Sequence, residues 1–181
     1  MDTFDVDQAV TDLMSHASDG AVRLGFQLTH NWATAEDLVQ EALLRIYRVW
    51  TRRPPEQLVS PDAYLRKTVV NLFLEIRRTS ASTEVVTHLP GAGGGAVPDF
   101  SQQLVDRDVL WEALASLPQR QRAALVLRHF ESLSHSEIGE ILRCRESTAR
   151  SLTTRGLATL RKTVAMTAAM TTDTTTRTEN R

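Results

Sequence analysis

The chain has 181 residues, enough for one domain of ordinary size or two small ones, and 41% of them are hydrophobic, so we expect a folded core. Its single cysteine, Cys144, excludes an internal disulfide and a cysteine-rich zinc site and fits a reducing cytoplasm. No apolar run approaches the roughly 18 residues of a membrane span, and the acidic N-terminus is unlike a signal peptide. We therefore expect a cytoplasmic protein with no membrane partner.

The charged residues are segregated along the chain, although the net charge is only -1. Residues 1–41 contain eight acids and one base, whereas residues 45–78 contain eight bases and three acids. Residues 143–162 contain six bases and one acid. This distribution is typical of a protein that contacts nucleic acid with some faces and a protein partner with others.

Two helical patterns fill the first 50 residues. Residues 6–30 have apolar positions at helical spacing and predict one helix or two, with Gly20 interrupting or kinking the pattern. The next pattern runs to Trp50, and Thr34 is a candidate N-cap for it because its hydroxyl can accept a backbone hydrogen bond.

A third helix and a linker follow. Residues 52–61 contain three prolines and predict a loop, and Pro61 suits the first turn of a helix over 61–78. Residues 79–101 include GAGGGAVP and no lysine or arginine. Such a composition predicts a flexible linker between domains.

The helical pattern returns at about Gln102 and is broken once, at Pro118. We expect a second domain over 102–162 and, because residues 163–181 are threonine-rich and lack aromatic side chains, a disordered tail. Since no strand pattern stands out, the predicted fold class is all-α, with two small helical domains joined by the flexible linker.

Residues 133–161 have the pattern of a helix-turn-helix. Ser134 and Glu137 match a capping box, and the small Gly139 suggests that another helix approaches closely. The turn is predicted at 143–145, with the second helix beginning near Glu146.

The second helix of this motif has two different faces. Four small or apolar residues share one face and predict packing inward: Ala149, Leu152, Gly156 and Leu160. The opposite face is polar and basic, with Ser147, Arg150, Ser151, Thr154, Arg155 and Arg161. Arginine can bind a guanine edge or a phosphate, so this face suits DNA. The alternative is a solvated face of an ordinary helical bundle.

Three segments together resemble the sigma-70 superfamily of bacterial sigma factors, in particular the small extracytoplasmic-function group. They are AEDLVQEALLRIYRVW (35–50), PDAYLRKTVVNLFLEIRR (61–78) and the stretch from LPQRQRAALVLRHF through the helix-turn-helix (117–161). The resemblance implies that 1–78 corresponds to region 2, which binds core polymerase and opens the −10 element. It implies that 102–162 corresponds to region 4, which recognises the −35 element.

The resemblance also implies a docking site on RNA polymerase. Sigma factors bind the clamp helices of the largest subunit, and contact the flap, and the matching clamp-binding positions here are Asp37, Gln40, Glu41, Leu44 and Arg45. A polar edge beside an apolar stripe suits docking on a partner helix. The alternative is that Asp37 and Glu41 only stabilise the helix dipole.

Two sets of DNA contacts follow from the same resemblance. The −10 set is Arg66, Lys67, Asn71, Leu72, Phe73, Arg77 and Arg78, with Asn71 near a flipped base, Leu72 and Phe73 as its wall and the basic residues on phosphates. Core packing is the alternative for Leu72 and Phe73. The −35 set has Ser147, Arg150, Ser151 and Thr154 at base edges, and Arg145, Arg155 and Arg161 on phosphates.

The turn departs from the family pattern, in which glycine and serine are frequent where this chain has Arg143 and Arg145. The loss of that serine leaves two possibilities for the start of the recognition helix: Arg145 contacts phosphate, or the helix starts later with Ser147 as its cap.

Two other functions compete with a promoter-specificity subunit. A stand-alone helix-turn-helix regulator explains 133–161, but it has no need of the 35–78 block. An enzyme is disfavoured, because GAGGG at 91–95 follows no strand, has no lysine after it, and the five histidines show no metal-ligand spacing. We expect no cofactor and no metal. The resemblance adds an anti-sigma factor as an expected partner.

Overall fold

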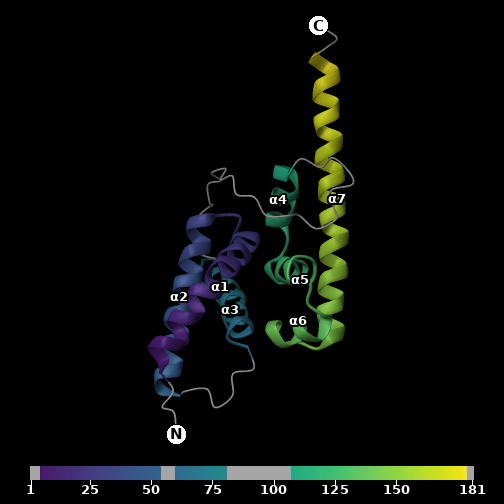
Figure 1. Ribbon diagram of the computed structural model, residues 1–181. Helices are drawn as coiled ribbons and strands as arrows, with labels where there is room; N and C mark the ends of the chain where they lie inside the picture. Colours follow the sequence, from purple (N-terminus) through teal and green to yellow (C-terminus); the bar gives the residue numbers. More distant parts are fainter. Residues whose placement is uncertain (1–4, 54–59, 81–106, 179–181) are drawn as a thin grey trace. The chain divides into compact units, whose positions relative to one another are not determined.

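The computed structural model describes residues 5–53, 60–80 and 107–178, with side chains given for all of these except 77–80, 107–108 and 168–178. These residues form seven α-helices and no strand, which confirms the all-α prediction (Figure 1). The chain divides into two compact units, Met1–Gly94 and Gly95–Arg181. The boundary lies inside the predicted linker 79–101.

Unit 1 contains α1 (Val6–Thr29), α2 (Trp32–Arg52) and α3 (Pro61–Ser80), and every pair of these helices is in contact. Its core is built from fully buried aliphatic side chains of all three helices: Leu24, Leu28, Leu38, Ile46, Leu65, Val69 and Val70. Because α3 packs against both α1 and α2, more than one of its faces is buried.

The connection between α1 and α2 differs from the sequence prediction. Gly20 lies inside a continuous α1, which ends at His30 in the left-handed conformation (φ 55°). Asn31, not Thr34, caps α2: its side-chain oxygen accepts a hydrogen bond from the backbone N–H of Thr34 at 2.9 Å. Asparagine ranks above threonine at an N-cap, so the helix begins three residues earlier than expected.

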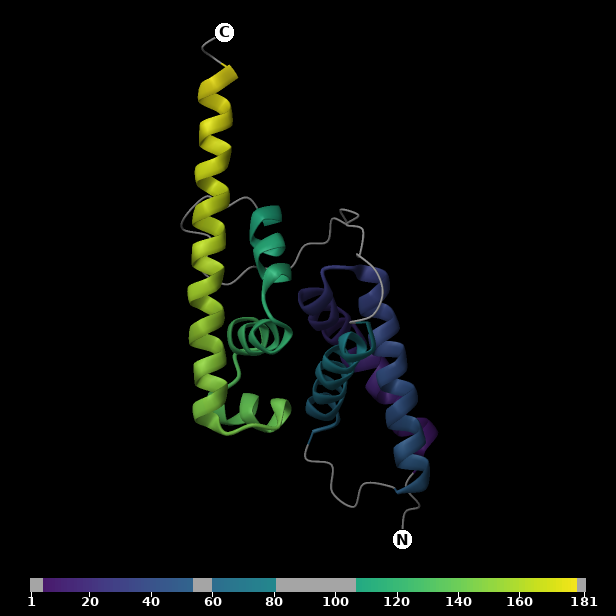
Figure 2. The same cartoon turned by 180° about the vertical axis from the view of Figure 1, so that it is seen from behind.

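Unit 2 contains α4 (Arg107–Ser116), α5 (Gln119–His129), α6 (His135–Leu142) and α7 (Glu146–Thr178) (Figure 2). Pro118 separates α4 from α5, as predicted. The core joins side chains from all four helices: Ala113, Leu114, Ala123, Val126, Leu127, Ile138, Leu142, Ala149 and Leu160.

The predicted helix-turn-helix is confirmed in detail. The hydroxyl of Ser134 accepts from the backbone N–H of Glu137 at 3.2 Å, and the carboxylate of Glu137 accepts from the backbone N–H of Ser134 at 2.8 Å, which completes the capping box. Helix α6 ends at Leu142 and is followed by its C-cap Arg143 in the left-handed conformation (φ 51°), and α7 begins at Glu146.

The C-terminal segment corrects a prediction. Residues 163–178 continue α7 as helix, although the threonine-rich composition predicted a disordered tail. The hydroxyls of Thr163 and Thr167 donate to the carbonyls of Thr159 and Thr163, both at 3.1 Å, so these polar groups are satisfied within the helix. The neighbouring alanines and methionines are good helix formers.

None of the helices in the described ranges is long and apolar enough to cross a membrane.

The tight approach at Gly139 makes a stability prediction. A Cβ at Gly139 would lie 2.8 Å from the backbone carbonyl oxygen of Cys144 in the turn, closer than Cβ atoms are found in proteins, so the backbone would have to shift. We expect Gly139→Ala to lower the free energy of unfolding of unit 2 by about 1–2 kcal/mol, because overpacking outweighs the gain in helix propensity.

The matched control is Gly20→Ala, since a Cβ at Gly20 meets nothing within 4 Å. This variant should stabilise unit 1 by about 0.5–1 kcal/mol. Hydrogen exchange read peptide by peptide reports each unit separately. Equal stabilisation by both substitutions would contradict the close approach at Gly139.

Candidate nucleic-acid and protein interfaces

One stripe of α2 remains exposed along the unit. Its members recur at helical spacing and share a face: Asp37, Gln40, Glu41, Leu44 and Arg45. Asp37 and Gln40 are exposed, and Leu44 is 51% exposed, which is unusual for a large apolar side chain. The other side of α2 carries the buried Leu38, Ala42 and Ile46. The structure therefore brings the five predicted docking residues together on one surface, here called the α2 face.

An ion pair ties the α2 face to α3. The guanidinium of Arg45 lies 2.9 Å from the carboxylate of Glu75 and 4.0 Å from that of Glu41. These side chains are about half exposed, so the pair contributes at most about 1 kcal/mol. Its main effect is to hold Arg45 toward α3.

Tyr47 borders the α2 face and was not singled out from the sequence. It is 40% exposed. The Asp7 carboxylate accepts a hydrogen bond from its hydroxyl, and this raises the pKa of Tyr47 above its usual value of 10.0. The contact links the first turn of α1 to α2, and no pattern local to either helix predicts it.

The predicted −10 residues of α3 fall into three groups. Arg66, Lys67 and Asn71 are half-buried. Leu72 and Phe73 are 4% and 6% exposed, so their assignment as a wall for a flipped base is corrected in favour of core packing. The side chains of Arg77 and Arg78 lie outside the described residues.

Tyr64 is a further candidate that the sequence did not single out. It is 36% exposed, at one edge of α3, with its ring centroid 6.0 Å from that of Trp50. At helical spacing it shares a stripe with Lys67 and Asn71. An exposed aromatic ring beside an amide and a cation is a platform on which an unpaired base can stack.

Helix α7 presents the two faces that its pattern predicted. Its inward stripe, Ala149, Leu152, Gly156 and Leu160, is buried. Thr153 is also buried, and its hydroxyl donates to the carbonyl of Ala149 at 3.0 Å. Every predicted −35 residue is exposed: Arg145, Ser147, Arg150, Ser151, Thr154, Arg155 and Arg161.

The start of α7 resolves the register left open by the sequence. The carbonyl of Arg145 accepts from the backbone N–H groups of Thr148 and Ala149 at 2.9 and 3.0 Å, so the helix starts at Glu146 and Ser147 is not its cap. The guanidinium of Arg150 lies 3.0 Å from the carboxylate of Glu146, one turn away.

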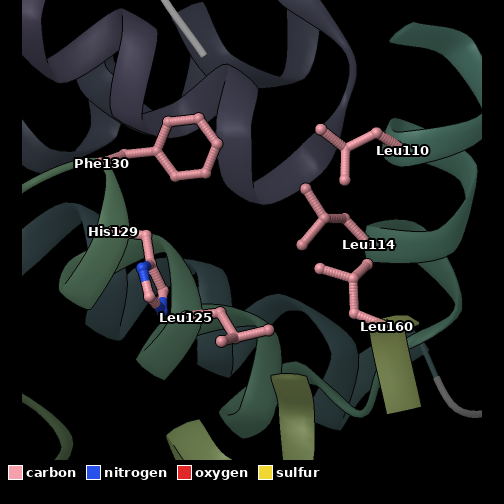
Figure 3. A pocket seen from close by; sticks show the side chains of 6 residues that line it. All are labelled: Leu110, Leu114, Leu125, His129, Phe130 and Leu160. Carbon is pink, nitrogen blue, oxygen red and sulfur yellow. The ribbon is translucent and has the colours of Figure 1, made fainter. Parts of the chain in front are cut away.

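A small pocket with about 10 Å³ of enclosed space, partly open to solvent, lies between α4, α5 and α7 (Figure 3). Five of its lining side chains are apolar: Leu110, Leu114, Leu125, Phe130 and Leu160. The sixth is His129. The enclosed space is close to that of a single water molecule, so the pocket is a shallow apolar depression in the surface.

Burial lowers the pKa of His129 below its usual 6.5, and the positive charges of Arg128 and Arg161 and the neighbouring His135 act in the same direction. His129 is therefore neutral at pH 7, which keeps the pocket apolar. In the part of the chain that the structure describes, no group of three His, Cys, Asp or Glu side chains is placed to hold a metal ion.

Comparison with known proteins agrees with this geometry. The model of Sigma-70 region 2 matches residues 13–83, and that of Sigma-70, region 4 matches residues 107–160. RNA polymerase sigma-E factor of Streptomyces avermitilis is 36% identical over 145 residues, covering 80% of this chain and 78% of that protein. The chain belongs to the sigma-70 family, in its extracytoplasmic-function group.

Other relatives and solved structures are consistent with this assignment. The ECF RNA polymerase sigma factor SigW of Bacillus subtilis is 27% identical over 168 residues, covering 85% of this chain and 88% of that protein. The sigma factor RpoE of Bartonella quintana, solved with the anti-sigma factor NepR, has the same fold: TM-score 0.64, 21% identity, 86% of this chain and 96% of that one.

This sigma factor binds core RNA polymerase and directs promoter-specific initiation of transcription. The match to region 2 removes the alternative of a stand-alone helix-turn-helix regulator, which accounts for unit 2 alone.

The lowered pKa of His129 predicts how the stability of unit 2 changes at low pH. Because its pKa is lower in the folded state than in the unfolded chain, the unfolded chain binds the proton more readily. Stability should therefore be unaffected by this group above pH 6.5 and should fall as the pH drops from about 6.5 toward the folded pKa.

Replacement of His129 by glutamine should flatten this part of the pH profile. Thermal unfolding of both proteins between pH 7.5 and 5.5 measures the difference. Identical slopes for the two proteins would mean that burial of His129 does not resist protonation.

Proposed function

We propose that the two units divide the work of a sigma factor. Unit 1 docks on core polymerase through the α2 face and opens the −10 element with α3, while unit 2 reads the −35 element with α7. The observation that carries the proposal is the division of α7 into a buried stripe and an exposed basic face. The polymerase supplies the chemistry, and this chain acts in the cytoplasm as its recognition subunit without catalysis of its own.

The α2 face fits a helical partner on the polymerase. Leu44 supplies an exposed apolar contact, and Gln40 and Asp37 supply polar groups one and two turns away, respectively, along the same stripe. This combination suits a coiled-coil partner such as the clamp helices of the largest subunit. Glu41 and Arg45 complete the surface.

For −10 opening, we assign the amide of Asn71 to a flipped base, and Arg66, Lys67, Arg77 and Arg78 to phosphates. Tyr64 replaces Leu72 and Phe73 as the stacking wall, because it is exposed and they are buried. Leu74, which is half-buried on the stripe of Asn71, extends this wall.

For the −35 element, Ser147, Arg150, Ser151 and Thr154 are assigned to base edges. Their short or forked polar side chains lie near the start of α7, where a recognition helix enters the major groove. Arg145, Arg155 and Arg161 are assigned to phosphates.

Two protein partners follow for other surfaces. The shallow apolar depression of unit 2, lined by Leu110, Leu114 and Phe130 among others, is assigned to contact with the flap of the polymerase. An anti-sigma factor is proposed as the inhibitor of this chain, by analogy with the structure of the Bartonella quintana relative in complex with NepR. Constitutive activity in cells, with no inhibitor recovered by co-purification, would count against it.

The function is tested by pull-down of core polymerase with the purified chain, followed by run-off transcription on fragmented genomic DNA. Stoichiometric binding with new discrete transcripts is expected, and these transcripts identify the promoters. Failure to bind polymerase, together with tight binding of the chain alone to duplex DNA, would overturn the proposal.

Asp37→Arg tests the docking face. Reversing this exposed charge should abolish polymerase binding in the pull-down without unfolding unit 1, because the side chain makes no core contact. The matched control is Glu36→Arg, since Glu36 is equally exposed but points about 100° away around α2. Full-strength binding by the Asp37 variant would remove the assignment.

Arg150→Ala tests the reading of bases. If its guanidinium binds one base edge bidentately, the variant loses about 1–3 kcal/mol on the native −35 sequence and relaxes specificity at one position. Arg155→Ala, at a phosphate candidate on the same helix, should weaken binding equally on all sequences. Competition binding of the holoenzyme to native and scrambled −35 DNA separates the two. Equal losses for Arg150→Ala on both DNAs would make Arg150 a phosphate contact.

A further inference from the structure

Three arginines of α5 each donate to the backbone carbonyl of a different neighbouring segment. The guanidinium of Arg122, which is 6% exposed, donates to the carbonyls of Ala115 and Leu117 at the end of α4. Arg128 donates to the carbonyl of Leu133, just before α6, at 2.8 Å. The arginines of α5 thus hold the end of α4 and the segment before α6 through hydrogen bonds to backbone carbonyls.

The third arginine, Arg120, reaches the end of α6. Its guanidinium donates to the carbonyl of Leu142 at 2.8 Å, although the two residues are 22 positions apart. The last carbonyls of a helix have no partner within the helix, and a cation there also complements the helix dipole. A charge-assisted hydrogen bond is stronger than a neutral one, but Arg120 is exposed, so solvent reduces the contribution of this bond to stability.

The carbonyl that Arg120 binds lies at the turn between α6 and α7. The carbonyl of Leu142 belongs to the peptide that leads into Arg143, the left-handed residue at which the chain turns. Only the three residues of the turn, 143–145, lie between Leu142 and Glu146, the first residue of α7. Gly139 packs against the same turn, where the carbonyl of Cys144 leaves no room for a Cβ. The turn is thus held by close packing against Gly139 and by the hydrogen bond from Arg120.

We propose that Arg120 is a positioning residue for promoter recognition: by fixing the Leu142–Arg143 peptide, it sets the angle at which the first turn of α7 meets the base edges. Arg120 touches no base in this role. The inference rests on the proposed assignment of −35 reading to the exposed face of α7.

The test compares Arg120→Ala with Arg128→Ala in the full-length chain bound to core polymerase. Both variants remove one cation of α5 and one side-chain bond to a backbone carbonyl, but Arg128 acts before α6 rather than at the turn. The readout is the ratio of affinities for promoter DNA with the native −35 element and with single-base substitutions in it, measured over a range of salt concentrations.

We expect Arg120→Ala to lower this discrimination ratio by about 3- to 10-fold, a partial loss compared with that of a direct base contact. Arg128→Ala should leave the ratio within about 2-fold of the value for the unchanged protein. The dependence of affinity on salt should change no more for Arg120→Ala than for Arg128→Ala. A phosphate ligand would behave differently: its loss reduces the slope of log affinity against log salt by about 1 and leaves discrimination unchanged. That result, or equal discrimination by the two variants, would overturn the proposal.

Two further measurements distinguish a local effect on the turn from a folding defect. Hydrogen exchange of the free variants should accelerate at residues 143–148 in Arg120→Ala alone, whereas general unfolding would accelerate exchange throughout unit 2. If Arg120→Ala does not fold, Arg120→Met decides: it keeps an unbranched aliphatic stem but removes the hydrogen-bond donor, so reduced discrimination supports positioning and native discrimination overturns it.

Arg150→Ala shows whether a negative result rules out only the positioning role of Arg120 or also the assignment of −35 reading to α7. If Arg150→Ala relaxes base specificity and Arg120→Ala does not, only the positioning role is wrong. If neither variant changes specificity, the assignment of −35 reading to α7 is itself wrong.

Discussion

The recognition of DNA by unit 2 depends on how closely α7 packs against α5. A Cβ at Gly156 would lie 3.0 Å from the side chain of Leu125, so any larger residue there would require the Leu125 side chain to shift by a few tenths of an ångström. With Ala149 and Leu160 also buried, α7 has one rotational setting about its axis. Since each residue advances the helix by about 100°, this setting determines which side chains face outward. The direction of the arginines is therefore a consequence of core packing.

Unit 1 meets a different requirement, because docking and strand opening are assigned to helices that share one small core. Arg45 belongs to the α2 face and also pairs with Glu75 on α3 at 2.9 Å. Tyr47 links α2 to the first turn of α1 through Asp7. The exposed surfaces of the three helices are thus joined by polar contacts as well as by burial, and a partner that engages α2 acts on a surface held in register with α3.

The sequence predicted features that depend on neighbours along the chain and failed where distant contacts decide. The capping box of Ser134, the turn at 143–145 and the two faces of α7 follow from local hydrogen bonding and helical period. The burial of Leu72 and Phe73 does not, because α3 is apolar on several sides and only its packing against both α1 and α2 shows which are covered. The exposed Tyr64 was missed for the same reason. Composition also misled at 163–178, where threonine hydroxyls bond within the helix.

The ion pair between Glu146 and Arg150 lowers the affinity of the first turn of α7 for phosphate groups. In the unbound chain the Arg150 guanidinium already has a carboxylate at 3.0 Å, so any phosphate must displace an internal competitor. The exchange is nearly neutral for a single exposed contact, since such a pair contributes only about 0.3–0.5 kcal/mol. A guanine edge offers two parallel hydrogen bonds and gains more than it displaces. With Arg150 at a base edge as proposed, this competition would weaken binding to arbitrary DNA more than binding to a promoter.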